Sequence, residues 1–285
     1  MASQTVYLDS ALWFNLAEDQ TSREVFETSI SSGSLIPVLS FIHLTEFSRR
    51  RQFERLQVAN YVDRINAICP ILWSKGLATI TEAEVKNAFL ASLGIEPAPI
   101  VVFANNFIDA MTKPVGWADK VDITTQRVST IVERLRRTPS TPKYLEYRKS
   151  VPVFDIPGLR NLRQSKGKVY IDLPLCVRDT LGKAVTTPKG LKFDVTKGLL
   201  DRFLSKFKPN TCPAFSLALA FLDGWSKSDG GEMPSIFEDF FHLMALAYCD
   251  IMFADGQTCE ALKKGRAFKK PMPNAKFPGW ANSLV

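Results

Sequence analysis

The chain has 285 residues, of which 46% are hydrophobic and 23% are charged. This length and composition are typical of a folded globular protein with a large core, and they exclude both a peptide-sized module and a chain that is disordered throughout. The longest apolar runs are far shorter than the roughly 20 residues that a membrane-spanning helix needs, so we expect no membrane segment.

The N-terminus and the cysteines both indicate the compartment. The segment from Met1 to Asp9 has no basic start followed by an apolar stretch and a cleavage site, so we expect no signal peptide and a cytoplasmic protein. The five cysteines are scattered and never spaced as Cys-x-x-Cys, which favours a reducing compartment over a disulfide scaffold. With only two histidines in the chain, a zinc site is not expected.

The net charge of +7 is unevenly distributed along the chain. Residues 120–210 carry 20 basic and eight acidic side chains, whereas residues 211–255 carry one basic and seven acidic side chains. Such a division is typical of a protein in which one part binds phosphate and another holds a cation. A solvated basic surface with no specific partner explains the composition equally well.

The first 70 residues have a pattern typical of a β-α-β unit. Residues 5–8 and 35–39 are short β-prone runs, and residues 22–31 between them have helical spacing. Ser40 is the expected N-cap of a long helix that continues to about residue 67.

The middle of the chain alternates helical patterns with loop-rich sequence. Residues 81–93 and 119–137 have helical spacing, and residues 100–112 are ambiguous between strand and helix. From residue 138 to about residue 190, prolines and glycines interrupt a short, basic pattern. Helical spacing then returns over residues 195–207, 213–225 and 235–247, before a last buried strand over residues 250–254.

Four carboxylates occupy positions that suit a metal site. Asp9 follows the first predicted strand and Asp255 follows the last, and the carboxyl ends of parallel strands are where α/β sheets place their ligands. Glu46 and Asp239 lie on mostly apolar helices, where Glu46 either faces water or is directed at a cation and a buried Asp239 needs a partner. If these four side chains converge, only protons or cations can hold them together, and an all-oxygen set favours Mg²⁺ or Mn²⁺.

Three segments, taken in order, resemble the signature of PIN-domain nucleases. They are Tyr7-Leu8-Asp9-Ser10, then Glu46, then residues 238–242 leading into residues 248–255. The resemblance covers residues 1–60 and 230–265, and it implies a three-layer α/β/α fold with a mainly parallel central sheet. Residues 61–230 are then a large helical, loop-rich and basic insertion, and residues 266–285 are a basic C-terminal tail.

The resemblance implies a metal-dependent endoribonuclease that hydrolyses single-stranded RNA. The sequence departs from the family pattern at Ala11, where Asn is frequent, and at Gly256, where a basic or polar residue is frequent. A PIN-like protein that binds nucleic acid or acts as a scaffold without cleaving it, and a nuclease that acts on DNA, are the alternatives. By the resemblance, the residues that hold Mg²⁺ or Mn²⁺ and carry the reaction are Asp9, Glu46, Asp239 and Asp255.

Further residues are candidates for binding the substrate or supporting the acidic set. Ser10 is adjacent to Asp9, and His242 shares a helical face with Asp239, where it holds a carboxylate, contacts substrate or packs in the core. Asp250 opens the last strand, in either a structural or a metal-binding role. The candidates for substrate binding are Ser10, His242, Arg49, Arg50, Arg134, Arg136 and Arg137, and the accessory candidates are Asp250 and Glu238. Single-stranded RNA is the expected partner, while a homo-oligomer or a regulatory protein remains open.

Overall fold

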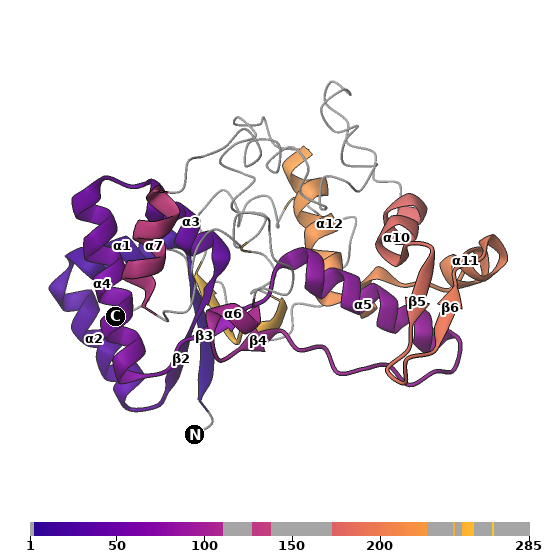
Figure 1. The fold of residues 1–285 in the computed structure, drawn as a ribbon, viewed down its shortest axis with the longest axis horizontal. Helices are drawn as coiled ribbons and strands as arrows, with labels where there is room; N and C mark the ends of the chain where they lie inside the picture. Colours follow the sequence, from indigo (N-terminus) through magenta and orange to yellow (C-terminus); the bar gives the residue numbers. More distant parts are fainter. Residues whose placement is uncertain are drawn as a thin grey trace.

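The computed structural model describes residues 3–110, 127–137, 173–226, 242, 247–253 and 264. Within these residues the protein is α/β, with a mixed, mostly parallel sheet of five strands, a separate two-stranded sheet and helices around both (Figure 1). The α/β class expected from the sequence is confirmed. No helix in the described part of the chain is long and apolar enough to cross a bilayer.

The five-stranded sheet has the order β4-β3-β2-β1-β7. Strand β1 pairs in parallel with β2 on one side and with β7 on the other, β2 pairs in parallel with β3, and β4 is antiparallel to β3. The chain therefore builds outward from β1 in one direction and returns to its opposite side with β7, so that β1 marks a topological switch point. The strands are β1 Gln4–Leu8, β2 Leu35–Ser40, β3 Leu72–Ser74, β4 Phe103–Ala104 and β7 Ile251–Phe253.

The predicted strands at residues 5–8 and 35–39 are confirmed as β1 and β2. Val6, Tyr7 and Leu8 are completely buried, and a continuous apolar run is what a parallel strand covered on both faces requires. The last predicted strand is present as β7, although it is described only over Ile251–Phe253.

One side of the sheet is covered by a layer of packed helices (Figure 1). Trp13 of α1 packs edge-on against Phe26 of α2 at a centroid distance of 5.8 Å, and α7 packs against α3 and α4. These contacts bury the apolar faces of the helices against the sheet. The helices of this layer are α1 Ser10–Glu18, α2 Gln20–Ser31, α3 Phe41–Arg49, α4 Gln52–Ile68 and α7 Val128–Arg137.

A second, smaller core lies on the other side of the sheet (Figure 1). Phe89 and Phe203 pack edge-on in it at a centroid distance of 5.4 Å, together with Phe215. The elements around it are α5 Leu77–Ser92, α10 Leu173–Leu181, β5 Ala184–Thr186, β6 Lys192–Asp194, α11 Lys197–Leu204, the short 3₁₀ helix η3 Pro209–Thr211 and α12 Pro213–Ser226.

The larger hydrophobic core, which lies between the five-stranded sheet and the helical layer and is called the main core below, continues into residues 61–230, the range expected to be an insertion. Val62, Ile65 and Trp73 belong to the main core, and so do the apolar residues of α7 and of the short helix α6 Phe107–Ala110. Strands β3 and β4 also belong to the five-stranded sheet, so the sheet and its core continue beyond residue 60. Among the described residues, the part with its own core consists of α5 and residues 173–226.

The long helix expected from Ser40 to residue 67 is two helices, α3 and α4. Arg50 adopts an extended backbone that ends α3, and the guanidinium of Arg55 donates from Nη1 to the Arg50 carbonyl at 3.0 Å. No proline or glycine marks this break, which explains why periodicity alone continued the helix across it. The structure also contains α1, which was not expected, and it begins α5 at Leu77 rather than at Thr81.

Candidate metal centre

Asp9 lies where the carboxyl ends of β1 and β7 meet. Its backbone N–H donates to the Phe253 carbonyl at 3.0 Å, which joins the ends of the two strands. Asp9 is also the N-cap residue of α1, but its side chain makes no cap hydrogen bond to that helix. The carboxylate therefore stands at the switch point of the sheet, the position where open α/β sheets bind ligands.

Glu46 reaches the same place from α3. Helix α3 starts directly after β2, and Ser40 caps it in a capping box with His43, as the sequence predicted for this N-cap. Ser10, at the start of α1, donates its hydroxyl hydrogen to Oε2 of Glu46. Ser10 is buried and thus positions Glu46 by a direct hydrogen bond between α1 and α3.

His242 completes a cluster of three side chains with Asp9 and Glu46. Its imidazole is buried, and Nε2 lies 3.3 Å from Oε2 of Glu46 across 196 positions of sequence. One potential ligand atom from each of Asp9, Glu46 and His242 lies within 4.8 Å of the other two. Two carboxylates and an imidazole at this spacing fit a divalent cation such as Mg²⁺ or Mn²⁺.

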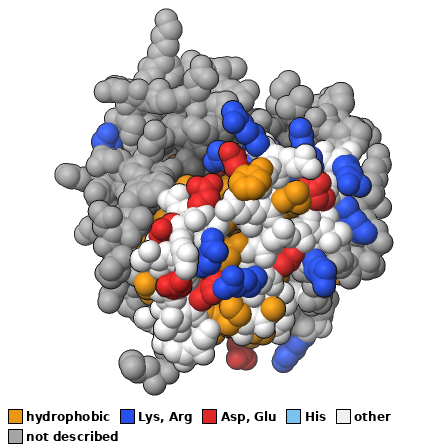
Figure 2. All heavy atoms as spheres, turned by 90° about the vertical axis from the view of Figure 1, so that its left-hand side faces the viewer, with side chains coloured by type: hydrophobic (Ala, Val, Ile, Leu, Met, Phe, Trp, Pro, Cys, Tyr) orange, Lys and Arg blue, Asp and Glu red, His pale blue; other side chains and the backbone are white. Residues whose placement is uncertain are grey.

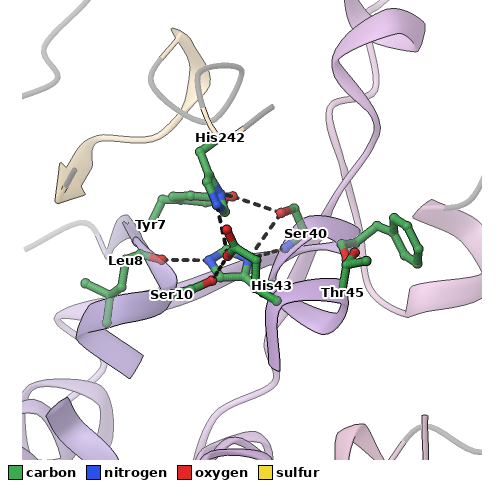
Figure 3. Close-up of polar contacts among 9 residues, drawn as sticks. Tyr7, Leu8, Ser10, Ser40, His43, Thr45 and His242 are labelled. Atoms are coloured by element: carbon green, nitrogen blue, oxygen red, sulfur yellow. Dashed lines mark hydrogen bonds and ion pairs between the residues drawn. The ribbon is translucent and has the colours of Figure 1, made fainter. Parts of the chain in front are cut away.

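A buried polar chain of Tyr7, Ser40, His43 and His242 lies behind this cluster (Figure 3). The Tyr7 hydroxyl is hydrogen-bonded to Nδ1 of His242, and it lies 2.8 Å from the Ser40 hydroxyl. The Ser40 backbone N–H donates to Nδ1 of His43 at 3.0 Å, so His43 carries its proton on Nε2 and donates it to the Leu8 carbonyl at 2.7 Å. The buried polar chain thus runs from the cluster back to the end of β1.

The electrostatics of the cluster and of the buried polar chain differ. Burial alone would raise the pKa of Glu46, but the electrostatic interaction with His242 and the hydrogen bonds from His242 and Ser10 outweigh it and lower that pKa to about 2. Burial, with repulsion from His242, lowers the pKa of His43 to about 3. Burial also raises the pKa of Tyr7 well above its ordinary value. At neutral pH the cluster therefore carries the ionised Glu46, while His43 and Tyr7 are uncharged.

Asp250 is hydrogen-bonded to Thr5, at the opposite end of the strands from Asp9. Its Oδ2 accepts the backbone N–H of Thr5 at 2.7 Å and the Thr5 hydroxyl at 2.8 Å, and its own N–H donates back to that hydroxyl at 2.9 Å. Asp250 precedes β7 and Thr5 lies near the start of β1, so this pair is at the amino ends of the two strands. Asp9 is at their carboxyl ends.

The basic candidates lie at the ends of α3 and α7, which pack against each other. Arg49 and Arg50 are exposed, and the Arg50 guanidinium lies 4.8 Å from the centroid of the Phe14 ring. Arg136 and Arg137 are exposed and Arg134 is half-buried. On the face of the helical layer, acidic and basic side chains are interspersed rather than gathered by sign (Figure 2).

The remaining acidic candidates, Glu238, Asp239 and Asp255, lie outside the described residues, and so does most of the helix expected over residues 235–247. Neither Tyr7 nor His43 was expected from the sequence to take part in the site. One local signal existed for His43, since it stands three residues after the predicted N-cap, where a capping-box side chain is placed.

No protein-family model, curated protein or solved structure matches this chain significantly. The chemistry of the candidate metal centre therefore has to be derived from its own residues.

Proposed function

We propose that the protein is a metal-dependent nuclease of PIN-like α/β/α architecture that hydrolyses phosphodiester bonds in single-stranded RNA. The observation that carries the proposal is the convergence of Asp9, Glu46 and His242, which come from three distant segments, at the carboxyl end of β1. Two of these residues, Asp9 and Glu46, are members of the acidic set expected from the sequence.

The chemistry follows from the donor set. A bound Mg²⁺ or Mn²⁺ supplies an activated water and stabilises the charge that develops on the phosphate, so no protein nucleophile is required. Asp9 and Glu46 would hold the ion, and Ser10 would keep Glu46 in place through its hydrogen bond. Asp239 and Asp255 would complete the carboxylate set, and Asp255 follows the last residue of β7 by two positions in the sequence.

The surroundings of the centre support a polyanionic substrate. The exposed Arg49 and Arg50 end the helix that carries Glu46, and the exposed Arg136 and Arg137 end the neighbouring helix α7, together with Arg134. Guanidinium groups bind phosphate oxygens through charge-assisted hydrogen bonds. These arginines would bind phosphates of the RNA backbone.

The test is cleavage of a labelled single-stranded RNA and a single-stranded DNA of the same sequence, each with Mn²⁺, Mg²⁺ or EDTA. Cleavage of RNA that requires metal, and that falls by about 100-fold or more in Asp9→Asn and in Glu46→Gln, is the expected result. Glu24→Gln is the matched control, because Glu24 is an exposed carboxylate on α2 and its loss should leave cleavage unchanged.

Other outcomes would identify the alternatives. Metal-independent binding of RNA without cleavage, unchanged in Asp9→Asn, would favour a nucleic-acid-binding or scaffold protein. Preferential cleavage of the DNA strand would identify a nuclease that acts on DNA.

A further inference from the structure

The candidate metal centre contains His242, whereas the metal site expected from the sequence consists of carboxylates alone. We propose that Nε2 of His242 is itself a metal ligand, so that the centre adds one imidazole to its carboxylates and prefers Mn²⁺ over Mg²⁺. This inference rests on the metal dependence of the proposed function and specifies the ion that the centre selects.

The position of Nε2 leads to this assignment. It lies 3.3 Å from Oε2 of Glu46, and it belongs to the group of ligand atoms within 4.8 Å that includes a carboxylate oxygen of Asp9. A nitrogen lone pair directed at a carboxylate is repulsive unless a proton or a cation lies between them. Without metal, the Nε2–H proton fills this place; with metal bound, the ion does.

The buried polar chain offers His242 a hydrogen-bond partner at Nδ1 in both arrangements. When Nε2–H of His242 donates to Glu46, Nδ1 accepts the Tyr7 hydroxyl hydrogen and Tyr7 accepts that of Ser40. When Nε2 binds metal, Nδ1–H donates to Tyr7 and Tyr7 donates to Ser40, while the Ser40 hydroxyl, 3.1 Å from Nδ1 of His43, shares the lone pair that already accepts the Ser40 N–H. The His242 ring carries one proton in each arrangement, so only the directions of the hydrogen bonds change.

His43 is the fixed end of the buried polar chain and not a second ligand. Its Nε2–H is held by the Leu8 carbonyl and its Nδ1 accepts the Ser40 N–H in both arrangements. Tyr7 provides what a metal-binding histidine requires at its other nitrogen, a buried polar partner that fixes the orientation of the ring.

A nitrogen ligand determines the choice of metal. Mg²⁺ is held almost entirely by oxygen ligands and water, whereas imidazole nitrogen suits the first-row transition metals, among which Mn²⁺ also accepts carboxylates. A centre with His242 as a ligand should therefore bind Mn²⁺ more tightly than Mg²⁺.

The decisive experiment uses the unmodified full-length protein. Mn²⁺ is added, and its nitrogen couplings are measured by pulsed electron paramagnetic resonance, once on protein at natural abundance and once on protein with ¹⁵N-labelled histidine. Because the chain has only two histidines and both nitrogens of His43 are engaged, a histidine coupling reports His242. We expect a ¹⁴N coupling that becomes a ¹⁵N coupling on labelling.

The result that would overturn the inference is bound Mn²⁺ without any histidine coupling. That result would mean that only oxygen atoms of the protein bind the ion, and the proposed nuclease function would remain valid. If the protein binds no Mn²⁺ at all, the metal-dependent function fails together with this inference.

Variants provide a second readout through the affinities for Mn²⁺ and Mg²⁺, measured by calorimetry. His242→Gln should weaken Mn²⁺ binding by about tenfold or more and Mg²⁺ binding by less, while Tyr7→Phe should keep the nitrogen coupling and weaken Mn²⁺ binding by about tenfold. Tyr61→Phe is the matched control, since it removes a buried tyrosine hydroxyl on α4, a helix that contributes no residue to the described cluster. Equal losses of Mn²⁺ and Mg²⁺ affinity in His242→Gln would show that His242 only supports Glu46.

Discussion

His43 donates its Nε2–H to the main-chain carbonyl of Leu8 at 2.7 Å, and this bond holds α3 against the end of β1, one residue before Asp9. The other nitrogen of the ring accepts the backbone N–H of Ser40, the last residue of β2. One buried imidazole therefore fixes β1, β2 and α3 relative to one another at the candidate metal centre.

The burial of His43 predicts a pH-dependent stability. Its pKa falls from 6.5 to about 3 on folding because burial, with repulsion from His242, disfavours the charged ring. Between these values the unfolded chain binds a proton that the folded protein does not, so the free energy of unfolding should fall as the pH falls from 6.5 towards 3, by at most about 1.4 kcal/mol per pH unit. Urea unfolding at pH 7, 6 and 5 in EDTA measures this decline.

The control for this prediction is His43→Gln, which lacks the titrating group. Its free energy of unfolding should be lower at pH 7 but should change less between pH 7 and pH 5 than that of the wild type. Equal slopes in the two proteins would mean that His43 does not titrate on unfolding in this range.

Truncation of the Glu84 side chain should lower the free energy of unfolding substantially. Its buried carboxylate accepts the backbone N–H groups of Ala214 and Phe215 at 2.8 Å each, and also the Tyr248 hydroxyl. Glu84→Ala removes the acceptor of two buried N–H groups and of the half-buried Tyr248 hydroxyl, so we expect a loss of about 3 kcal/mol, and a smaller loss for Glu84→Gln, which keeps one acceptor oxygen. Chemical denaturation measures both, with Glu96→Ala as an exposed control; a loss no larger than that of the control would contradict the assignment.

Asp63 makes a similar contact between α4 and the start of α7. Its carboxylate accepts the backbone N–H groups of Val128 at 2.6 Å and Ser129 at 3.1 Å. Because Asp63 is only half-buried, we expect Asp63→Ala to lower the free energy of unfolding by about 1–2 kcal/mol, less than Glu84→Ala. Thermal unfolding compares Asp63→Ala with Glu84→Ala. A larger loss of stability in Asp63→Ala would show that the burial of the carboxylate does not determine which variant is less stable.

The variant Asp250→Asn tests whether Asp250 is a structural carboxylate or a metal ligand. Asp250→Asn weakens the hydrogen bonds that join Asp250, just before β7, to Thr5 in β1. The variant should therefore be less stable by about 1–2 kcal/mol. Its affinity for Mn²⁺, measured by calorimetry on the folded protein, should equal that of the wild type. A loss of affinity as large as that of Asp9→Asn would instead assign Asp250 to the metal centre.

The sequence by itself predicted the parts of the fold that local patterns encode. Strands β1 and β2 were evident because a buried parallel strand must be apolar along its whole length, and Ser40 was evident as an N-cap because its side chain suits that position. Asp9 was singled out because it follows a predicted strand, at the end where parallel α/β sheets place their ligands, and Glu46 because it lies on a mostly apolar helix. The break at Arg50 and the pairing of β5 with β6 were missed, since no proline or glycine marks the break and the strands have only three residues each.

Only the tertiary structure decided which residues surround Asp9 and Glu46. Tyr7 and His242 are 235 positions apart, and nothing in either local sequence indicates that their side chains are hydrogen-bonded. The return of the chain to the free side of β1 brings His242 to Glu46 and the Asp250 carboxylate to Thr5 at the opposite end of the strand. Contacts of this kind depend on strand order and on which end of a strand a residue occupies, and these are properties of the assembled sheet rather than of any segment within it.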